Sequence, residues 1–125
     1  MDLSREDNLR VEVLENATVV QFASGPIRDE KKIYDALESL NQYAASNGDS
    51  RLVLDLTNIE YFSSCGLGLL VSLLKKLRMG GGTLKLCCVN EKILDLFKVM
   101  HLTNIFDVHE DQQMALVDMG VVNAC

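Results

Sequence analysis

The chain has 125 residues, of which 48% are hydrophobic and one is proline, so its size predicts a single domain, residues 1–125, with its own hydrophobic core. Its formal net charge of −6 and its pI near 4.8 argue against nucleic acid and against an anionic membrane surface as partners, because both bind basic protein surfaces. The composition therefore favours proteins or small molecules as partners.

Three further features of the sequence concern the compartment. Residues 1–7 are charged and precede no apolar run, which is unlike a secretory signal. No window approaches the roughly 18 consecutive apolar residues of a membrane-spanning helix, and the four cysteines lack C-x-x-C spacing. We therefore expect a cytoplasmic protein with free thiols and no membrane insertion.

The first part of the chain is typical of a hairpin followed by a helix. Residues 9–14 and 17–23 alternate or cluster apolar side chains around a Glu-Asn turn at 15–16, which predicts two strands. The Ser-Gly-Pro run at 24–26 ends the second strand. Apolar residues at helical spacing then predict a helix over 29–45, followed by an Asn-Gly stop signal.

From residue 51 onward, strand-like and helix-like segments alternate. The predicted elements are a buried strand at 51–56, an apolar helix at 65–79 ended by three glycines, a strand at 83–89, a short helix at 91–100, a strand at 104–108 and a last helix with an acidic cap at 111–119. This order predicts an α/β fold with a four- to five-stranded mixed sheet and about four helices packed on it. The helix at 65–79 is apolar around nearly its whole circumference, so we expect burial by the sheet and by a second surface, a partner being one candidate.

The most informative stretch is residues 61–68, Tyr-Phe-Ser-Ser-Cys-Gly-Leu-Gly, where the strand gives way to the apolar helix. Ser64 is the expected N-cap, because a serine there accepts hydrogen bonds from free helix amides, which would also stabilise an anion on its oxygen. Gly66 and Gly68 each cost up to about 1 kcal/mol relative to alanine within a helix. Either the bare backbone admits another surface close to Ser64, or the glycines permit tight packing of the helix on the sheet.

Other chemistries have weaker support in the sequence. A reactive thiol at Cys65 remains an alternative, as a thiol enzyme or redox sensor, but neither His101 nor His109 is near it in sequence. The glycines lack the third position of the dinucleotide-binding fingerprint, and no phosphate-binding P-loop motif is present. The two histidines have no second pair of metal-type ligands at useful spacing. We predict no enzymatic activity, no cofactor and no metal.

Several runs together carry a resemblance to a known family. They are residues 52–56 (LVLDL), 59–68 (IEYFSSCGLG), 81–86 (GGTLKL), 94–97 (LDLF), 102–106 (LTNIF) and 111–116 (DQQMAL). In these runs, and in the order of its elements, the chain resembles the STAS domain of bacterial anti-sigma factor antagonists. The resemblance covers nearly the whole chain, from about residue 9 to 119, and implies the same α/β fold.

The resemblance also implies a function and a site. Members of this family bind a kinase-like, ATP-binding anti-sigma factor, which phosphorylates a serine at the start of the middle helix and so ends the complex; a metal-dependent serine phosphatase reverses this. The family motif Asp-Ser-Ser/Thr-Gly places Ser63 at the aspartate, Ser64 at the acceptor and Cys65 at the next small residue. Ser64 is thus the implied phosphorylation site, with Ser63 as a less favoured acceptor.

The sequence departs from the family pattern at two places. Ser63 replaces the usual aspartate, and Arg28 stands where a Gly-x-aliphatic-Asp motif has its acidic residue, with Asp29 immediately after. The partner surface implied by the family consists of Ser63, Ser64, Cys65, Gly66 and Leu67, with Gly25, Ile27, Arg28 and Asp29 as a second edge. The prediction is a binding module released by phosphorylation of Ser64. The alternative is a STAS module that is never phosphorylated, either a constitutive scaffold or the cytosolic subunit of a transporter complex.

Overall fold

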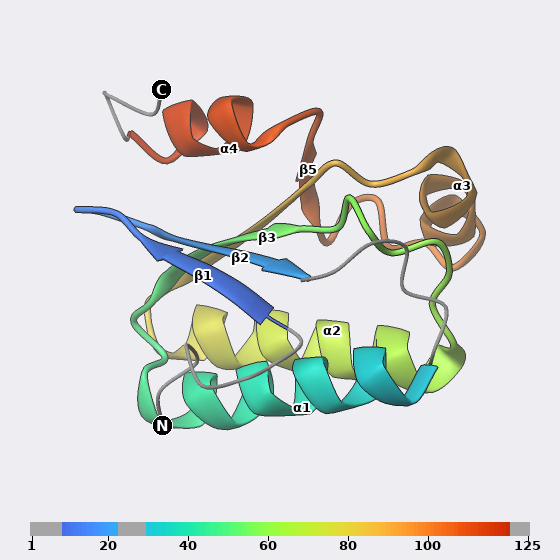
Figure 1. Cartoon of the computed structure of the whole chain (residues 1–125), viewed down its shortest axis with the longest axis horizontal. Coiled ribbons are helices and arrows are strands. Elements are labelled where there is room, and N and C mark those ends of the chain that lie inside the picture. Colours follow the sequence, from blue (N-terminus) through green and yellow to red (C-terminus); the bar gives the residue numbers. More distant parts are fainter. Residues whose placement is uncertain (1–8, 23–29, 121–125) are drawn as a thin grey trace.

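The structure is a computed structural model that describes residues 9–22 and 30–120. Its elements are β1 (Leu9–Val13), β2 (Thr18–Phe22), α1 (Glu30–Ser46), β3 (Arg51–Asp55), α2 (Ser64–Met79), β4 (Thr83–Cys87), α3 (Glu91–Val99), β5 (Asp107–His109) and α4 (Gln112–Asp118). The predicted architecture of a mixed sheet with helices packed on it is confirmed (Figure 1).

The five strands lie in the sheet in their chain order, β1-β2-β3-β4-β5. The predicted opening hairpin is confirmed: β1 and β2 pair antiparallel, and the amide of Leu14 donates to the carbonyl of Ala17 across the turn at 2.8 Å. The remaining neighbours pair in parallel, each joined through a helical connection. The carboxyl ends of β3 and β4 therefore lie side by side, and the chain leaves β3 there to reach α2.

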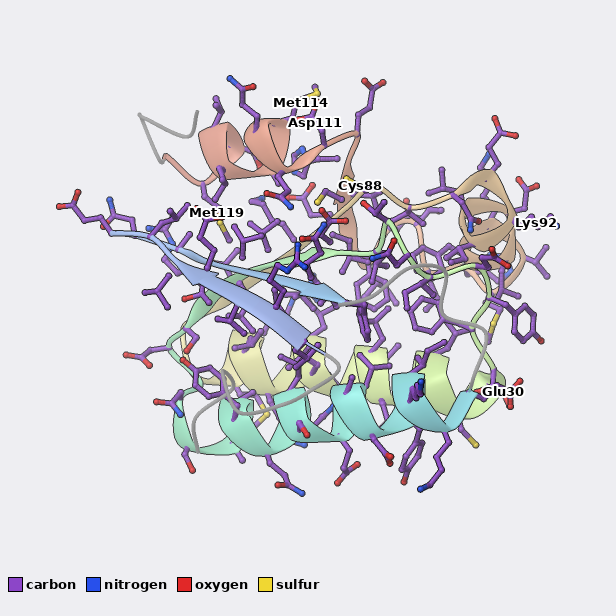
Figure 2. The ribbon with its side chains drawn as sticks, in the orientation of Figure 1. Glu30, Cys88, Lys92, Asp111, Met114 and Met119 are labelled. Atoms are coloured by element: carbon purple, nitrogen blue, oxygen red, sulfur yellow. The ribbon has the colours of Figure 1, made fainter. Side chains whose placement is uncertain are left out.

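Helices cover both faces of this sheet. Figure 1 shows α1 and α2 packed side by side under one face, α4 over the opposite face and α3 at one end. The main core lies between the sheet and the α1–α2 pair, and a smaller core lies under α4, where Figure 2 places Met119 and Cys88. The expected burial of α2 on two sides is confirmed, and α1 is its second cover. None of the helices in the described ranges has the length and apolarity needed to cross a membrane.

The last strand lies later than predicted. The sequence placed it at 104–108, but β5 occupies Asp107–His109. The amides of Ile105 and Phe106 donate to the carbonyl of Leu102 at 3.0 and 3.1 Å, so the chain is still turning there. The apolar side chain of Phe106 is buried against Phe97, with ring centroids 5.5 Å apart, and packing of a turn explains the apolar run.

Among the basic residues near the end of α2, Lys75 and Arg78 are exposed and Lys76 is half-buried. Arg78 donates to the carbonyl of Ile105 at 2.9 Å, and Lys76 donates to the side-chain oxygen of Asn41 at 2.8 Å. Asn41 is 3% exposed, and its amide nitrogen donates to two backbone carbonyls. Lys76 therefore supplies the donor that the buried amide oxygen needs between α1 and α2.

The turns that follow α1 and α2 meet backbone to backbone. A Cβ atom at Gly80 would lie 2.5 Å from both the Cα and the carbonyl oxygen of Gly48. Gly81 has φ of 83°, a left-handed conformation that favours glycine over other residues. The glycine run that ends α2 thus lets β3 and β4 start next to each other.

Candidate functional site at the start of α2

The N-cap of α2 is Ser63, one residue before the serine expected in that role. Ser63 has an extended backbone, with φ −74° and ψ 166°, and its side-chain oxygen accepts from the amide of Gly66 at 3.1 Å. Its carbonyl accepts the first helical hydrogen bond, from Leu67 at 2.9 Å. Serine is a preferred N-cap residue at either position. With Ser63 as the cap, Phe62 before it and Leu67 in the first turns of the helix are both buried.

Ser64 is consequently the first residue of α2, and it is exposed to solvent. Because Ser63 caps the helix, the helix start does not depend on the hydroxyl of Ser64. The first amides of a 16-residue helix lie next to it, and the positive end of the helix dipole favours negative charge there. The position combines accessibility with a stabilising environment for a phosphate.

The residues of the predicted partner surface differ in their exposure to solvent. Ser64 and Cys65 are exposed and Ser63 is half-buried, whereas Gly66 and Leu67 are buried. The outward face of the first turn is therefore formed by Ser64 and Cys65. The predicted second edge, consisting of Gly25, Ile27, Arg28 and Asp29, lies outside the described residues.

The two glycines of this turn have different surroundings. A Cβ atom at Gly66 would lie 3.2 Å from the ring of Phe62 and 3.5 Å from the Ser63 oxygen, so tight packing explains that glycine. A Cβ atom at Gly68 would have no heavy atom within 4 Å among the described residues. The packing explanation therefore applies to Gly66 and not to Gly68.

The loop that leads to the site starts from a buried acidic residue. Asp55, at the end of β3, is 2% exposed. Its carboxyl group accepts from the amide of Thr57 at 2.8 Å and from the Thr57 hydroxyl, and it also accepts from the side chains of Gln112 at 2.6 Å and Gln21 at 3.3 Å. One side chain thus joins the loop, β2 and α4, a connection that the sequence analysis did not find.

Two asparagines hold the rest of this loop. Asn58 donates to the carbonyl of Phe22 at 2.7 Å. Asn90 caps α3, accepting from the amide of Ile93 at 2.9 Å, and donates to the carbonyl of Ile59 at 3.0 Å. The approach to Ser64 is therefore fixed on β2 and on α3. The cap at Asn90 is visible in the sequence as an asparagine just before a helix, but its second contact is not.

An apolar groove lies beside this loop, between Tyr61 and α3. It has a volume of about 340 Å³, and its lining is Glu60, Tyr61, Lys92, Ile93, Asp95, Leu96 and Val99. Tyr61 is 61% exposed and Val99 is 76% exposed. Figure 2 shows Lys92 on α3, at the end of the molecule where α2 begins. The groove therefore adjoins the chain segment that carries Ser64.

Cys65 is an exposed free thiol. Among the described residues, neither of the two groups of three or more potential metal ligands includes it. One of these groups consists of Asp55, Cys87 and Cys88. Burial, with the nearby Asp55 carboxyl adding to it, raises the pKa of Cys87, so this thiol stays protonated at neutral pH.

The second group consists of Asp107, His109 and Asp118, and its two carboxylates both pair with the ammonium group of Lys85. Lys85 donates to Asp118 at 2.5 Å and also to Asp107. Burial lowers the pKa of Lys85, but its hydrogen bonds to the two carboxylates outweigh this and raise it. The ammonium group thus satisfies both carboxylates and ties α4 to β4 and β5.

The comparisons with known proteins agree with this fold. A family model described as the STAS domain matches residues 8–115. The anti-sigma-B factor antagonist of Bacillus subtilis (strain 168) is 32% identical over 104 residues, covering 81% of this chain and 91% of that protein. An anti-sigma-factor antagonist (STAS) domain protein from Planctomyces limnophilus has the same fold, with a TM-score of 0.77 and 23% identity over 90% of this chain and 97% of that one.

A solved structure of the phosphorylated form of the Bacillus cell fate determinant SpoIIAA also shares the fold. Its TM-score is 0.64 at 14% identity, covering 89% of this chain and 98% of that one. At this identity the likeness concerns the fold alone. The family model and the Bacillus subtilis relative carry the assignment further: the chain belongs to the STAS domain family, among the anti-sigma factor antagonists.

Proposed function

We propose that this protein is a phosphorylation-controlled binding switch. Without phosphate it binds a kinase-like, ATP-binding anti-sigma factor in the cytoplasm, and phosphorylation of Ser64 by that partner releases it. A metal-dependent serine phosphatase then restores the binding form. The observation that carries this proposal is that the two serines have different roles at the helix start. Ser63 caps α2, and Ser64 is exposed at the first position of the helix.

The replacement of the usual aspartate by Ser63 is compatible with this proposal. Serine and aspartate are both preferred N-cap residues, and the Ser63 oxygen accepts the hydrogen bond from Gly66 that an aspartate oxygen would accept. Ser63 also places no carboxylate beside a phosphate on Ser64. The geometry of the helix start is thus kept without the acidic residue.

A phosphate on Ser64 supports release for an electrostatic reason. It adds about −1.5 to −2 charges in the middle of the contact surface, and these charges must lose water when a partner covers them. The amides of the first helical turn hold the phosphate in place in the free protein. The modification therefore stabilises the free form relative to the complex.

The test is a titration of Ser64→Asp and Ser64→Ala against the purified ATP-binding anti-sigma factors of the protein's host. Ser64→Ala is expected to bind within about threefold of the wild type, because the cap is Ser63, and Ser64→Asp is expected to bind more than tenfold more weakly (about 1.4 kcal/mol per factor of ten). Gln42→Glu, on the exposed side of α1, adds a charge elsewhere and serves as the control. Equal binding by Ser64→Asp and Ser64→Ala would contradict the proposal.

A further inference from the structure

Gly68 occupies a position in α2 where nothing in the described chain requires a glycine. It is exposed and lies within the helix, where glycine is less favourable than alanine. A Cβ atom there would meet no heavy atom of the described residues within 4 Å. Gly80, by contrast, has the backbone of Gly48 at 2.5 Å. The fold explains Gly80 and leaves Gly68 unexplained.

The position of Gly68 relative to Ser64 suggests a role for this glycine in binding. The two residues are four apart, so they lie on the same face of the helix, one turn from each other. A Cα–Cβ bond in a helix tilts toward the N-terminus, and a side chain at position 68 would lean over the turn that starts at Ser64. With glycine, the helix backbone directly behind the acceptor hydroxyl stays bare.

The other side of Ser64 along the chain presents apolar surface. Tyr61 is three residues earlier, and its exposed side chain lines the groove together with Leu96 and Val99 of α3. Exposed apolar surface that is gathered in one groove is typical of an interaction site. Along the chain, Ser64 therefore lies between Tyr61, which lines the apolar groove, and Gly68, where the helix backbone is bare.

We propose that the anti-sigma factor covers both features: it packs against the bare backbone of α2 at Gly68 and places an apolar side chain in the groove between Tyr61 and α3. This inference rests on the proposed function, because it describes how the same partner reaches Ser64. A protein that transfers a phosphoryl group to the Ser64 hydroxyl must bring its reacting groups to about 3 Å, so its surface comes close to the residues that flank Ser64.

Two variants of the full chain test this surface against the purified host anti-sigma factors. Gly68→Ala is expected to raise the thermal midpoint, because alanine favours the helix, and yet to weaken binding at least tenfold. Val99→Lys replaces an exposed residue near the end of α3, where positive charge suits the helix, and is also expected to weaken binding at least tenfold. Gln42→Ala, on the exposed side of α1, is the control that leaves binding unchanged.

Ser64→Asp in the same assay separates the two proposals. If Gly68→Ala binds the anti-sigma factor with wild-type affinity while Ser64→Asp binds weakly, the inference is wrong and the proposed function stands. Wild-type affinity in Val99→Lys removes the groove from the surface. If Ser64→Asp also binds like the wild type, the proposed function fails, and the inference fails with it.

Discussion

Asp55→Ala is expected to lower the free energy of unfolding by about 3 kcal/mol, because the buried Asp55 carboxyl accepts four hydrogen bonds, two of them from half-buried glutamine side chains. The donors are the amide and hydroxyl of Thr57 and the side-chain amides of Gln21 and Gln112. The loss acts on three parts of the fold at once, since Asp55 joins the loop before Ser64 to β2 and α4. Urea denaturation of the variant and of the wild type measures the difference.

Two controls assign the loss to these hydrogen bonds. Asp55→Asn keeps the shape and one acceptor oxygen, so we expect it to lose about half as much as Asp55→Ala. Gln112→Ala and the double variant form a mutant cycle that isolates the bond between β3 and α4. If Asp55→Ala unfolds within about 0.5 kcal/mol of the wild type, Asp55 does not hold the loop as described.

Gly80→Ala is expected to lower the free energy of unfolding by about 3 kcal/mol, because the added methyl group meets backbone on the opposite turn. Both the Cα and the carbonyl oxygen of Gly48 would lie 2.5 Å from it, and neither can move without shifting the start of β3. Gly80 itself has a φ of −87°, so the expected loss comes from this contact and not from backbone strain. Thermal and urea unfolding of the purified variant measure it.

The same substitution at Gly68 is the matched control for Gly80→Ala. Gly68 has open space where the methyl group would go, so Gly68→Ala is expected to raise the free energy of unfolding by about 0.5–1 kcal/mol. The two glycine-to-alanine changes thus have opposite predicted signs within one helix and its C-cap. A gain in stability for Gly80→Ala would contradict the close approach of the two turns.

The fold could be predicted from the sequence because local patterns and global packing agree. The helix expected at 29–45 is α1 at Glu30–Ser46, and its apolar positions at helical spacing are buried against the main core. The hairpin and the strands β3 and β4 were equally visible as short apolar runs between turn residues. The spacing of apolar residues and the positions of turn residues were enough to predict these elements.

What the sequence did not reveal depends on contacts between distant residues. The bond of Asp55 to Gln112 spans 57 positions, and the bond of Lys76 to the buried Asn41 spans 35. No local pattern contains such pairs. The turn at Ile105 and Phe106 has the composition of a strand, and only the packing of Phe106 on Phe97 shows its role.

The candidate site was predicted in part. Two hydroxyls at the junction of a strand and an apolar helix located it, but the choice of cap between Ser63 and Ser64 depends on which residues around them are buried. The sequence also left Gly66 and Gly68 equivalent. Only the surroundings of each Cβ position separate the glycine that packs from the glycine that faces open space.

The central claim is that Ser64 carries the phosphate, and its most direct test is the mass of the intact protein after incubation with ATP and a soluble extract of its own host, followed by phosphopeptide analysis. We expect one phosphate, on Ser64, and none in Ser64→Ala. A phosphate on Ser63 would contradict the assignment. The Ser63 side-chain oxygen accepts the capping hydrogen bond from Gly66, so we expect it to stay unmodified. No phosphate at all, in an extract that phosphorylates a control protein, would contradict the switch and favour a constitutive scaffold.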